Sequence, residues 1–388
     1  MSKEKLIPEF RFPEFKGEWS LEELGQCLDY LQPTPFLVDN TDYNDEYEIP
    51  VLTAGKSFIL GYTNEQEGIF NENLPVIIFD DFTTASQFVD FPFKTKSSAM
   101  KILLAKNGND IKFVYESMQT LNYEVGVHKR HWISVFSKLR IAVPKPQEQQ
   151  KIASCLSSLD ELIAAYKDKL DALKDHKKGL LQNLFPQEGE TVPKVRFPEF
   201  EEDGEWVEKK LGDAADFING RAYKKEELLT SGKYRVLRVG NFFTNKEWYY
   251  SDLELGEDKY CDNGDLLYAW SASFGPRIWK EEKVIYHYHI WKVVEKSGID
   301  KQFLFVLLDF ETENIKVAQA RGLGMQHLTK SGIETWESRI PQTKEEQQKI
   351  ASCLSAADEL ITAQQDKIEQ LQKHKKGLMQ GLFPKIES

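Results

Sequence analysis

The sequence predicts an α+β protein: two mixed α/β domains joined by two long antiparallel helices that form a coiled coil, with a pseudo-twofold internal repeat. Three observations support this prediction. The chain has 388 residues, which is too many for one ordinary hydrophobic core. Residues 149–186 align without gaps to residues 347–384, and 26 of these 38 positions are identical. The stretches between the repeats mix strand-like and helix-like patterns.

A shorter repeat opens each half of the chain. RFPEF occurs at 11–15 and again at 196–200, and each copy is followed by GEW and then by LG. The middles that lie between these like ends do not visibly align. Two copies are too few for a solenoid, so a dimer-like arrangement fused into one chain fits better. We expect two domains and two long helices, with these bounds: first domain 1–145, first helix 146–186, second domain 187–343, second helix 344–388.

Both copies of the longer repeat have the apolar spacing of a coiled coil. Seam positions step by four and three residues from Ile152 to Leu184 and from Ile350 to Leu382, which is a period of 3.5. At about 1.5 Å per residue, each helix is about 55 Å long. Two separate core helices would be the alternative. A seam of this length in both copies favours packing of the helices on each other, with the middles at opposite ends of a rod.

Lysine and glycine interrupt both seams at matching places. Lys177 and Lys375 stand at seam positions, and Gly179 and Gly377 follow two residues later. A glycine inside a helix costs about 1 kcal/mol relative to alanine, but the leucines beyond it stay in register, which favours a continuing helix over a cap. We expect the lysines to face a domain or a partner and the glycines to permit close approach. These four residues are our candidates for partner binding.

The middles carry runs rich in β-branched and aromatic residues, bounded by Gly, Asn and Asp, which predict strands. One further run, residues 300–310, reads as a buried helix. The predicted strands cover residues 74–82, 111–117, 232–242, 264–270 and 283–294.

Basic and hydroxyl-bearing stretches between these runs are expected to be loops. Such side chains bind phosphates and read base edges, although each stretch taken singly is compatible with an ordinary solvated loop. The candidate DNA-binding residues are Lys94, Lys96, Ser97, Lys101, His128, Lys129, Arg130, Arg221, Tyr223, Ser271, Ser273, Arg277, Arg321, Gln326 and His327.

Composition narrows the class of protein. No apolar run approaches the roughly 20 residues of a membrane span, and the N-terminus lacks a secretory pattern. The four cysteines lie far apart with no metal spacing, so we expect a cytoplasmic protein with reduced thiols. The net charge of −12 argues against a nucleic-acid partner, but a local basic face can still bind DNA.

Motifs for catalysis are weak. We find no methyltransferase motif of the (N/D)PP(Y/F) type and no glycine fingerprint after a strand. Asp265 with Glu281 and Lys283 resembles a nuclease set, but a polar turn explains the latter two. His287 and His289 alternate on a predicted strand without a further ligand at metal spacing, so we expect no metal site. A DNA-modifying enzyme and a protein–protein scaffold remain the alternatives.

The chain resembles the specificity subunit of a type I restriction–modification system. The resemblance rests on the two EQQKIASCLS segments with their DELI and long helices, on the RFPEF…GEW…LG openings, and on GDLLYAWSASFG at 264–275. Residues 75–88, PVIIFDDFTTASQF, depart from the last pattern. The residue correspondence in the first domain is therefore open.

The resemblance implies a non-catalytic reader of double-stranded DNA. Each domain would be a target recognition domain for one half of a split, asymmetric target, and the helices would set the gap. Two methyltransferase subunits would bring S-adenosylmethionine and methylate a flipped adenine, and motor–nuclease subunits would use ATP and Mg. No cofactor and no catalytic residue is expected in this chain.

Overall fold

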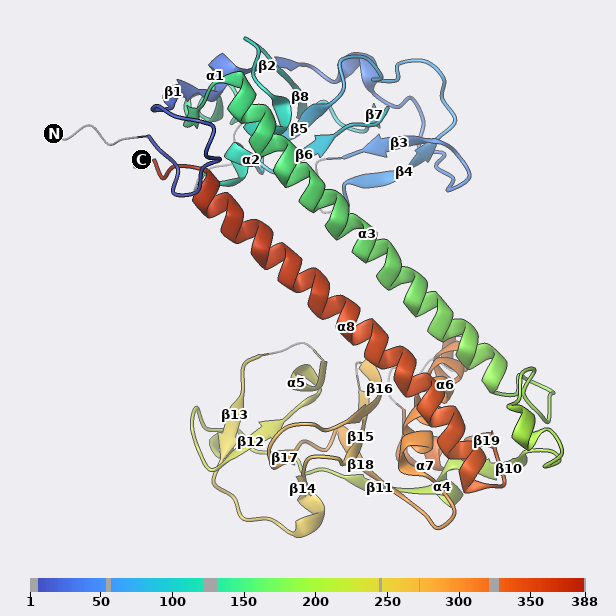
Figure 1. The fold of residues 1–388 in the computed structure, drawn as a ribbon. Helices are drawn as coiled ribbons and strands as arrows, with labels where there is room; N and C mark the ends of the chain where they lie inside the picture. The colour runs from blue at the N-terminus through green and yellow to red at the C-terminus, as the bar shows by residue number, and fades with distance from the viewer. Residues whose placement is uncertain are drawn as a thin grey trace. The chain divides into compact units, whose positions relative to one another are not determined.

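The computed structural model describes residues 6–53, 57–121, 131–243, 246–271, 273–320 and 328–386. The chain divides into two compact units, shown along the chain in Figure 1. The first unit comprises Met1–Asp168 and Asp366–Ser388, and the second comprises Lys169–Gln365. Each unit therefore contains part of both long helices, α3 (Pro146–Leu184) and α8 (Lys344–Leu382). No helix in the described part of the chain has the apolar length that a bilayer crossing requires.

The first unit contains two small sheets and a strand pair. A four-stranded antiparallel sheet has the order β2-β8-β5-β6, and a three-stranded sheet has the order β4-β3-β7 with β3 parallel to β7. β1 pairs with β9, the last strand before α3. The elements are β1 (Ser20–Glu23), α1 (Leu24–Cys27), β2 (Leu28–Leu31), η1 (Thr34–Phe36), β3 (Ile49–Leu52), β4 (Ile59–Thr63), β5 (Val76–Asp80), β6 (Ser86–Val89), β7 (Lys94–Thr95), β8 (Met100–Ala105), α2 (Ile111–Gln119), η2 (Phe136–Lys138) and β9 (Arg140–Val143).

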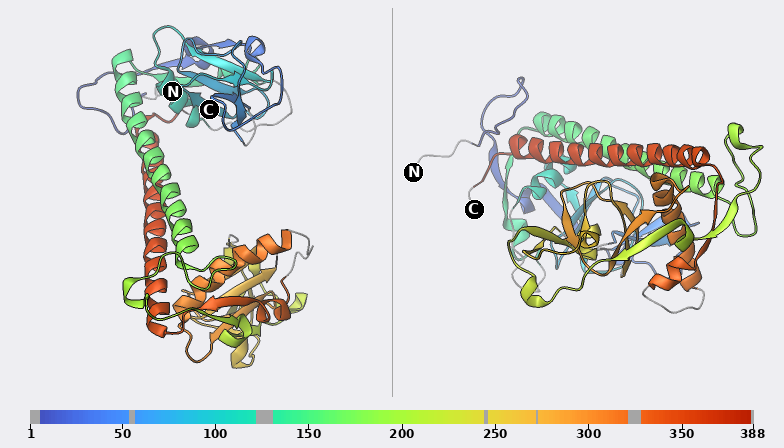
Figure 2. Two further views of the ribbon diagram at one scale, coloured as in Figure 1. Left: turned by 90° about the vertical axis from the view of Figure 1, so that its right-hand side faces the viewer. Right: turned by 90° about the horizontal axis from the view of Figure 1, so that it is seen from below.

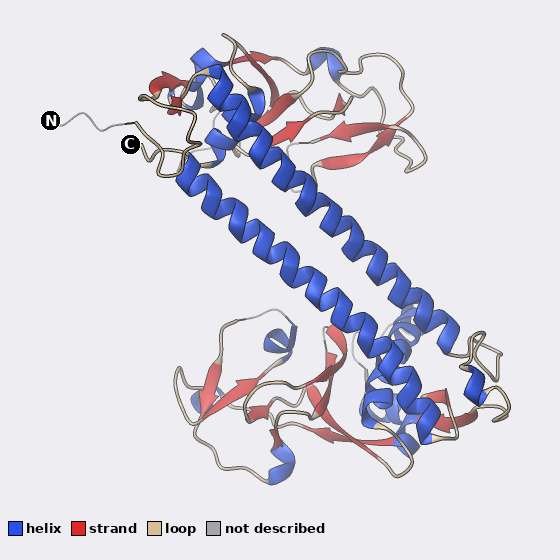
Figure 3. Cartoon of the chain, in the orientation of Figure 1, coloured by secondary structure: helices blue, strands red, loops and turns tan. Residues whose placement is uncertain are grey.

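The second unit contains two four-stranded sheets and a strand pair (Figure 3). The orders are β11-β18-β15-β16 and β13-β12-β17-β14, and β10 pairs with β19 directly before α8. The elements are η3 (Pro198–Phe200), β10 (Val207–Lys210), α4 (Leu211–Ala214), β11 (Ala215–Asn219), η4 (Lys225–Glu227), β12 (Tyr234–Leu237), α5 (Val239–Phe243), β13 (Tyr249–Ser251), η5 (Glu257–Lys259), β14 (Tyr260–Cys261), β15 (Leu266–Ser271), β16 (Ser273–Ile278), β17 (Val284–Tyr286), β18 (Ile290–Glu295), α6 (Lys301–Ala320), α7 (Lys330–Glu334) and β19 (Glu337–Ile340).

The two units share one topology although their middles do not align in sequence. Strand order β2-β8-β5-β6 in the first unit corresponds to β11-β18-β15-β16 in the second, with every neighbour antiparallel in both. The parallel pair β3·β7 corresponds to β12·β17, and the antiparallel β3·β4 pair corresponds to β12·β13. α2 and α6 occupy the same place in the order of elements. The internal repeat thus extends through the middles as a repeat of fold.

Each unit is completed by the start of one long helix and the end of the other (Figure 2). In the first unit, Leu156 of α3 and Leu382 of α8 are buried in one core with Phe113 of α2. In the second unit, Leu184 of α3 and Leu354 of α8 share a core with residues of α6. Burying each such side chain stabilises the fold by roughly 1.5–3 kcal/mol. Both helices continue past their HKKG glycines, as predicted.

Several local predictions are wrong. Residues 111–117 form helix α2, because the Asp110 side chain accepts the amide of Phe113 as an N-cap and the helix buries Phe113 and Val114. Lys94 and Lys101, predicted from the sequence to lie in loops, stand in strands β7 and β8. Residues 283–294 form two strands, with His287 to His289 in the connection. The strands at 74–82 and 264–270 and the helix at 300–310 are confirmed.

Candidate nucleic-acid interface

The repeated lysines join the two long helices in both units. Lys375 lies with its Nζ 2.7 Å from Oδ1 of Asp160 on α3 and 2.9 Å from Oε1 of Glu116 on α2. Lys177 lies 2.8 Å from Oδ1 of Asp358 on α8, in the matching position. The aspartates are themselves the repeated D of DELI, so the same pair is formed twice. A lysine late in one helix meets an aspartate early in the other, as antiparallel helices require.

The two lysine sites differ in their second acid. Lys177 reaches Asp309 of α6 at 3.3 Å, and this carboxylate is 40% exposed. Glu116 in the first unit is 1% exposed, and it also pairs with Lys112 at 2.8 Å. Burial alone would raise the pKa of Asp160, but hydrogen bonds from Lys112 and Lys375 outweigh it and hold the pKa below its ordinary value. The lysines therefore face acids of their own unit.

An arginine clasp ties each RFPEF segment to the first turn of a long helix. Arg11 donates from Nε and Nη2 to the two carboxylate oxygens of Glu148, each at 2.8 Å. Arg196 makes the same two bonds to Glu346, also at 2.8 Å. Both glutamates are buried, at 3% and 1% exposure, so these bidentate pairs are protected from water. The clasp gives a structural reason for the arginine that opens both copies of RFPEF.

The repeated helices also carry matched exposed positions. Leu162 and Leu360, both the L of DELI, are 42% and 58% exposed. A Cβ at Gly179 or Gly377 would meet no atom within 4 Å among the described residues. These leucines are exposed at equivalent places in the two copies of the repeat, so both are available to a partner. Whether the glycines bind a partner stays a prediction.

The candidate residues of the first unit separate into buried and exposed ones. Lys94 is 2% exposed and pairs with Glu65 at 2.6 Å, and Lys101 is 1% exposed and lies 3.4 Å from Asp81. The expectation that these two candidates lie in loops is wrong, because both point inward from strands, Lys94 to the partly buried Glu65 and Lys101 to the buried Asp81. Lys96 is exposed and Ser97 is partly exposed. His128, Lys129 and Arg130 lie outside the described residues.

Most candidate DNA-binding residues that the structure describes in the second unit are held by contacts within that unit. Arg221 forms two bonds to Glu227, at 2.7 and 2.9 Å, and Tyr223 is stacked 6.3 Å from the ring of His287. Ser271 is buried, and Ser273 lies on β16. Arg277 is exposed and donates to the carbonyl of Phe242. Arg321, Gln326 and His327 lie outside the part of the chain that the structure describes.

An aromatic and histidine group occupies the β17–β18 connection. The His287 ring lies 4.8 Å from His289, and Trp270 lies 4.9 Å from His289. Burial, then His289 and Arg238, lower the pKa of His287 to about 4, so its imidazole is neutral at neutral pH. Among the described residues, no cluster of three or more His, Cys, Asp or Glu has the arrangement of a metal site.

The nuclease-like set is not assembled. Asp265 pairs with Lys292 at 2.7 Å, Glu281 with Arg235 at 2.9 Å, and Lys283 with Glu257 at 3.5 Å. Each of the three residues therefore belongs to its own surface or strand-edge ion pair. Sequence reasoning also missed one residue, Arg238, because the run 232–242 read as a single strand. In the structure β12 ends at Leu237, which places Arg238 at its end.

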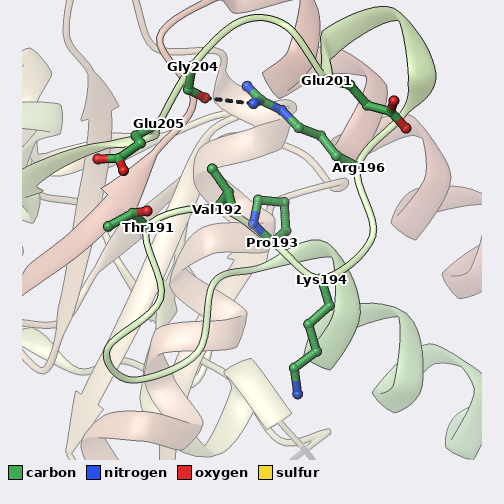
Figure 4. Close-up of a pocket in the computed structure, with 8 residues that line it drawn as sticks. All are labelled: Thr191, Val192, Pro193, Lys194, Arg196, Glu201, Gly204 and Glu205. Atoms are coloured by element: carbon green, nitrogen blue, oxygen red, sulfur yellow. Dashed lines mark hydrogen bonds between the residues drawn. The ribbon is translucent and has the colours of Figure 1, made fainter.

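One pocket of about 460 Å³ lies in the second unit, at the segment that enters it (Figure 4). Thr191, Val192 and Pro193 line one side, and Gly204 and Glu205 line another. Arg196 crosses it and donates to the carbonyl of Gly204. Because the same guanidinium is held by Glu346, the pocket belongs to the arginine clasp.

Comparison with known proteins identifies one family along nearly the whole chain. The family model described as type I restriction modification DNA specificity domain matches residues 17–175 and 203–373. A type I restriction enzyme specificity subunit of Escherichia coli, EcoR124I/EcoR124II, is 49% identical over 155 residues, covering 39% of this chain and 37% of that protein. The MjaVIII specificity subunit of Methanocaldococcus jannaschii is 28% identical over 96% of this chain and 93% of its own length.

Solved structures share the fold. The type I restriction–modification S subunit from M. genitalium gives a TM-score of 0.66 at 16% identity, covering 98% of this chain and all of that one. A structure reported for complex assembly and conformational transition of a type I system gives 0.53 at 16% identity, covering 94% and 96%. These two similarities concern the fold alone.

Proposed function

The chain belongs to the type I restriction–modification DNA specificity family, and from this premise we propose that it recognises a bipartite, asymmetric DNA target, one half with each unit. The observation that carries the proposal is a contrast within the chain. The RFPEF segments and the long helices, which form the frame, are repeated, whereas the middles between them are not. The two units share one strand topology, yet the sequences of their middles do not visibly align. Two like scaffolds with unlike sequences are suited to two different half-sites at a set spacing.

We propose further that two copies of a methyltransferase subunit dock on the repeated frame. Leu162 and Leu360 are equivalent, exposed and apolar, so a partner that fits one frame also fits the other. The HKKG segments, with open space at Gly179 and Gly377, are part of the same repeat. Motor–nuclease subunits would join this assembly.

In this proposal the chain contributes recognition and no catalytic group. The partners would supply S-adenosylmethionine, ATP and Mg together with the residues that use them. The acidic total charge of −12 is compatible with DNA binding if the partners provide much of the positive surface around the duplex.

The test exchanges one middle. Residues 20–143 are replaced by the first middle of another family member, and the assembled complex is used to map methylated sites on genomic DNA. We expect one half of the target to change and the other half and the reaction to persist. The unexchanged chain is the matched control.

A scaffold without DNA recognition predicts a different outcome. It would co-purify with its partners but bind DNA with no sequence preference, and the exchange would leave the methylated sites unchanged. Cleavage or methylation by the isolated chain would instead identify an enzyme. Either result refutes the proposal.

A further inference from the structure

The two parallel strand pairs end in different cationic side chains. In the second unit, β12 and β17 run parallel with Leu237 beside Tyr286, so Arg238 and His287 follow at one edge. In the first unit, β3 and β7 run parallel with Leu52 beside Thr95, so Lys96 follows at the equivalent edge.

An equivalent hydrogen bond in each unit confirms that these edges correspond. The amide of His287 donates to the carbonyl of Leu237 at 2.9 Å, and the amide of Lys96 donates to the carbonyl of Leu52 at 2.8 Å. His287 and Lys96 therefore occupy the same place in the shared topology. Parallel neighbours end at one edge, so side chains that follow the strands are presented together.

Two described arginines of the second unit pair with no carboxylate: Arg277, which donates to the carbonyl of Phe242, and Arg238. Arg196, Arg221, Arg235 and Arg339 all pair with carboxylates. Across the described ranges, no carboxylate pairs with Arg238, and its Nε is buried without a hydrogen-bond acceptor. Burial closes Nε to an acceptor from outside the chain, so the terminal Nη nitrogens, which are not among the buried atoms without a partner, are the donors that such an acceptor can reach.

The Arg238 guanidinium packs on an aromatic ring. Its carbon lies 4.2 Å from the centre of the Tyr249 ring, a cation–π contact that orients the fork. His287 beside it is neutral and can both donate and accept a hydrogen bond. A rigid fork next to a neutral imidazole is suited to planar acceptors more than to a diffuse negative charge.

Lys96 is the corresponding unpaired cation of the first unit, and it is more exposed than Arg238. Its neighbour at two residues' distance, Lys94, is buried against Glu65, whereas Lys96 is exposed. Its Nζ lies 5.9 Å from the centre of the Tyr43 ring, and no carboxylate of the described residues pairs with it. Each unit thus presents one unpaired cation over a tyrosine near the same strand-end edge.

We propose that these two edges are base-reading points, and this inference rests on the proposed function. Arg238 donates two hydrogen bonds to O6 and N7 of a guanine in the half-site read by the second unit, with His287 contacting the neighbouring base. Lys96 contacts a base edge in the other half-site. Arginine and lysine paired with the major-groove edge of guanine are common specific contacts in protein–DNA complexes.

The experiment selects DNA from a randomised duplex pool with the full chain assembled with its methyltransferase subunits. Wild type is compared with Arg238→Lys, Arg238→Gln and Lys96→Gln. Arg339→Gln, which loses only a frame ion pair to Glu208, is the matched control. Melting temperature and the retained half-site report folding of each variant.

We expect Arg238→Gln to lose preference at one G·C position by roughly 5- to 150-fold, the value of one bidentate contact, with the other half-site intact. Arg238→Lys keeps the charge without the planar fork and should lose a smaller part of the same preference. Lys96→Gln should relax one position of the other half only. A uniform loss over all sequences with a shallower salt dependence would identify phosphate contacts and overturn the inference, as would an unchanged selection. If wild type itself selects no sequence, the proposed function fails instead.

Discussion

Replacement of Lys375 by methionine removes one cation from a network of two lysines and two carboxylates. Lys112 and Lys375 both contact Glu116 and Asp160, at distances between 2.7 and 2.9 Å. After the replacement, one lysine serves two carboxylates, and one of these, Glu116, is 1% exposed. Leaving a buried charge without its partner costs about 3–5 kcal/mol when burial is complete. Because Asp160 is 36% exposed, we expect a loss of about 2–3 kcal/mol in the first unit.

The chain contains its own matched control. Lys177→Met changes the equivalent residue, but its acids, Asp309 and Asp358, are 40% and 38% exposed and regain water. We expect a loss of about 1 kcal/mol or less in the second unit. Hydrogen exchange followed by mass spectrometry during denaturant titration assigns each loss to its unit.

A second variant tests the cause. In Lys375→Met with Glu116→Gln, one lysine faces one carboxylate again, so stability should partly return relative to Lys375→Met alone. Equal losses for the two lysine replacements, or a double variant less stable than the single one, would refute the charge-balance reasoning.

Further predictions concern pH and assembly. Because the Asp160 pKa lies below its ordinary value, the stabilisation from this carboxylate is present above about pH 4 and lost as pH falls through its lower folded pKa; Asp160→Asn should flatten the acid limb of a pH titration of unfolding free energy. The pKa of His287 is about 4, lowered mainly by burial. As pH falls from about 6.5 to 4, the unfolded chain therefore binds a proton at this residue that the folded chain does not, and stability falls. His287→Gln should remove this part of the pH dependence, and an unchanged dependence of the unfolding free energy on pH would contradict the prediction. Leu162→Asp and Leu360→Asp should each reduce the bound methyltransferase subunits from two to one, measured by native mass spectrometry; two bound subunits in both variants would show that these leucines are not the docking positions.

The frame was accessible from sequence because its signals are local and repeated. The 3.5-residue period continues through both long helices. Because the same segment occurs twice in the chain, the pattern is not a chance one. The lysine–aspartate register was not accessible, because it depends on which residues meet across two helices far apart in the chain. Lys177 and Asp358 carry no pairing signal of their own.

The middles show why residue type alone misplaces a site. Lys94 and Lys96 are two residues apart and equally basic, yet Lys94 is buried against Glu65 and Lys96 is exposed. Residues 111–117 contain β-branched and aromatic residues, but the Asp110 cap and burial on one face of a helix prevail over strand propensity. Arg238 was hidden because the end of β12 is set by its pairing with β17.

The sharing of the long helices has a consequence for synthesis. The first unit contains the last residues of the chain, with Leu382 and Phe383 buried against Phe113 in its core. During translation, that core stays open until Leu382 and Phe383 have been made, while the second unit already has all its residues. A premature stop at residue 366 would therefore damage the part of the protein that was made first.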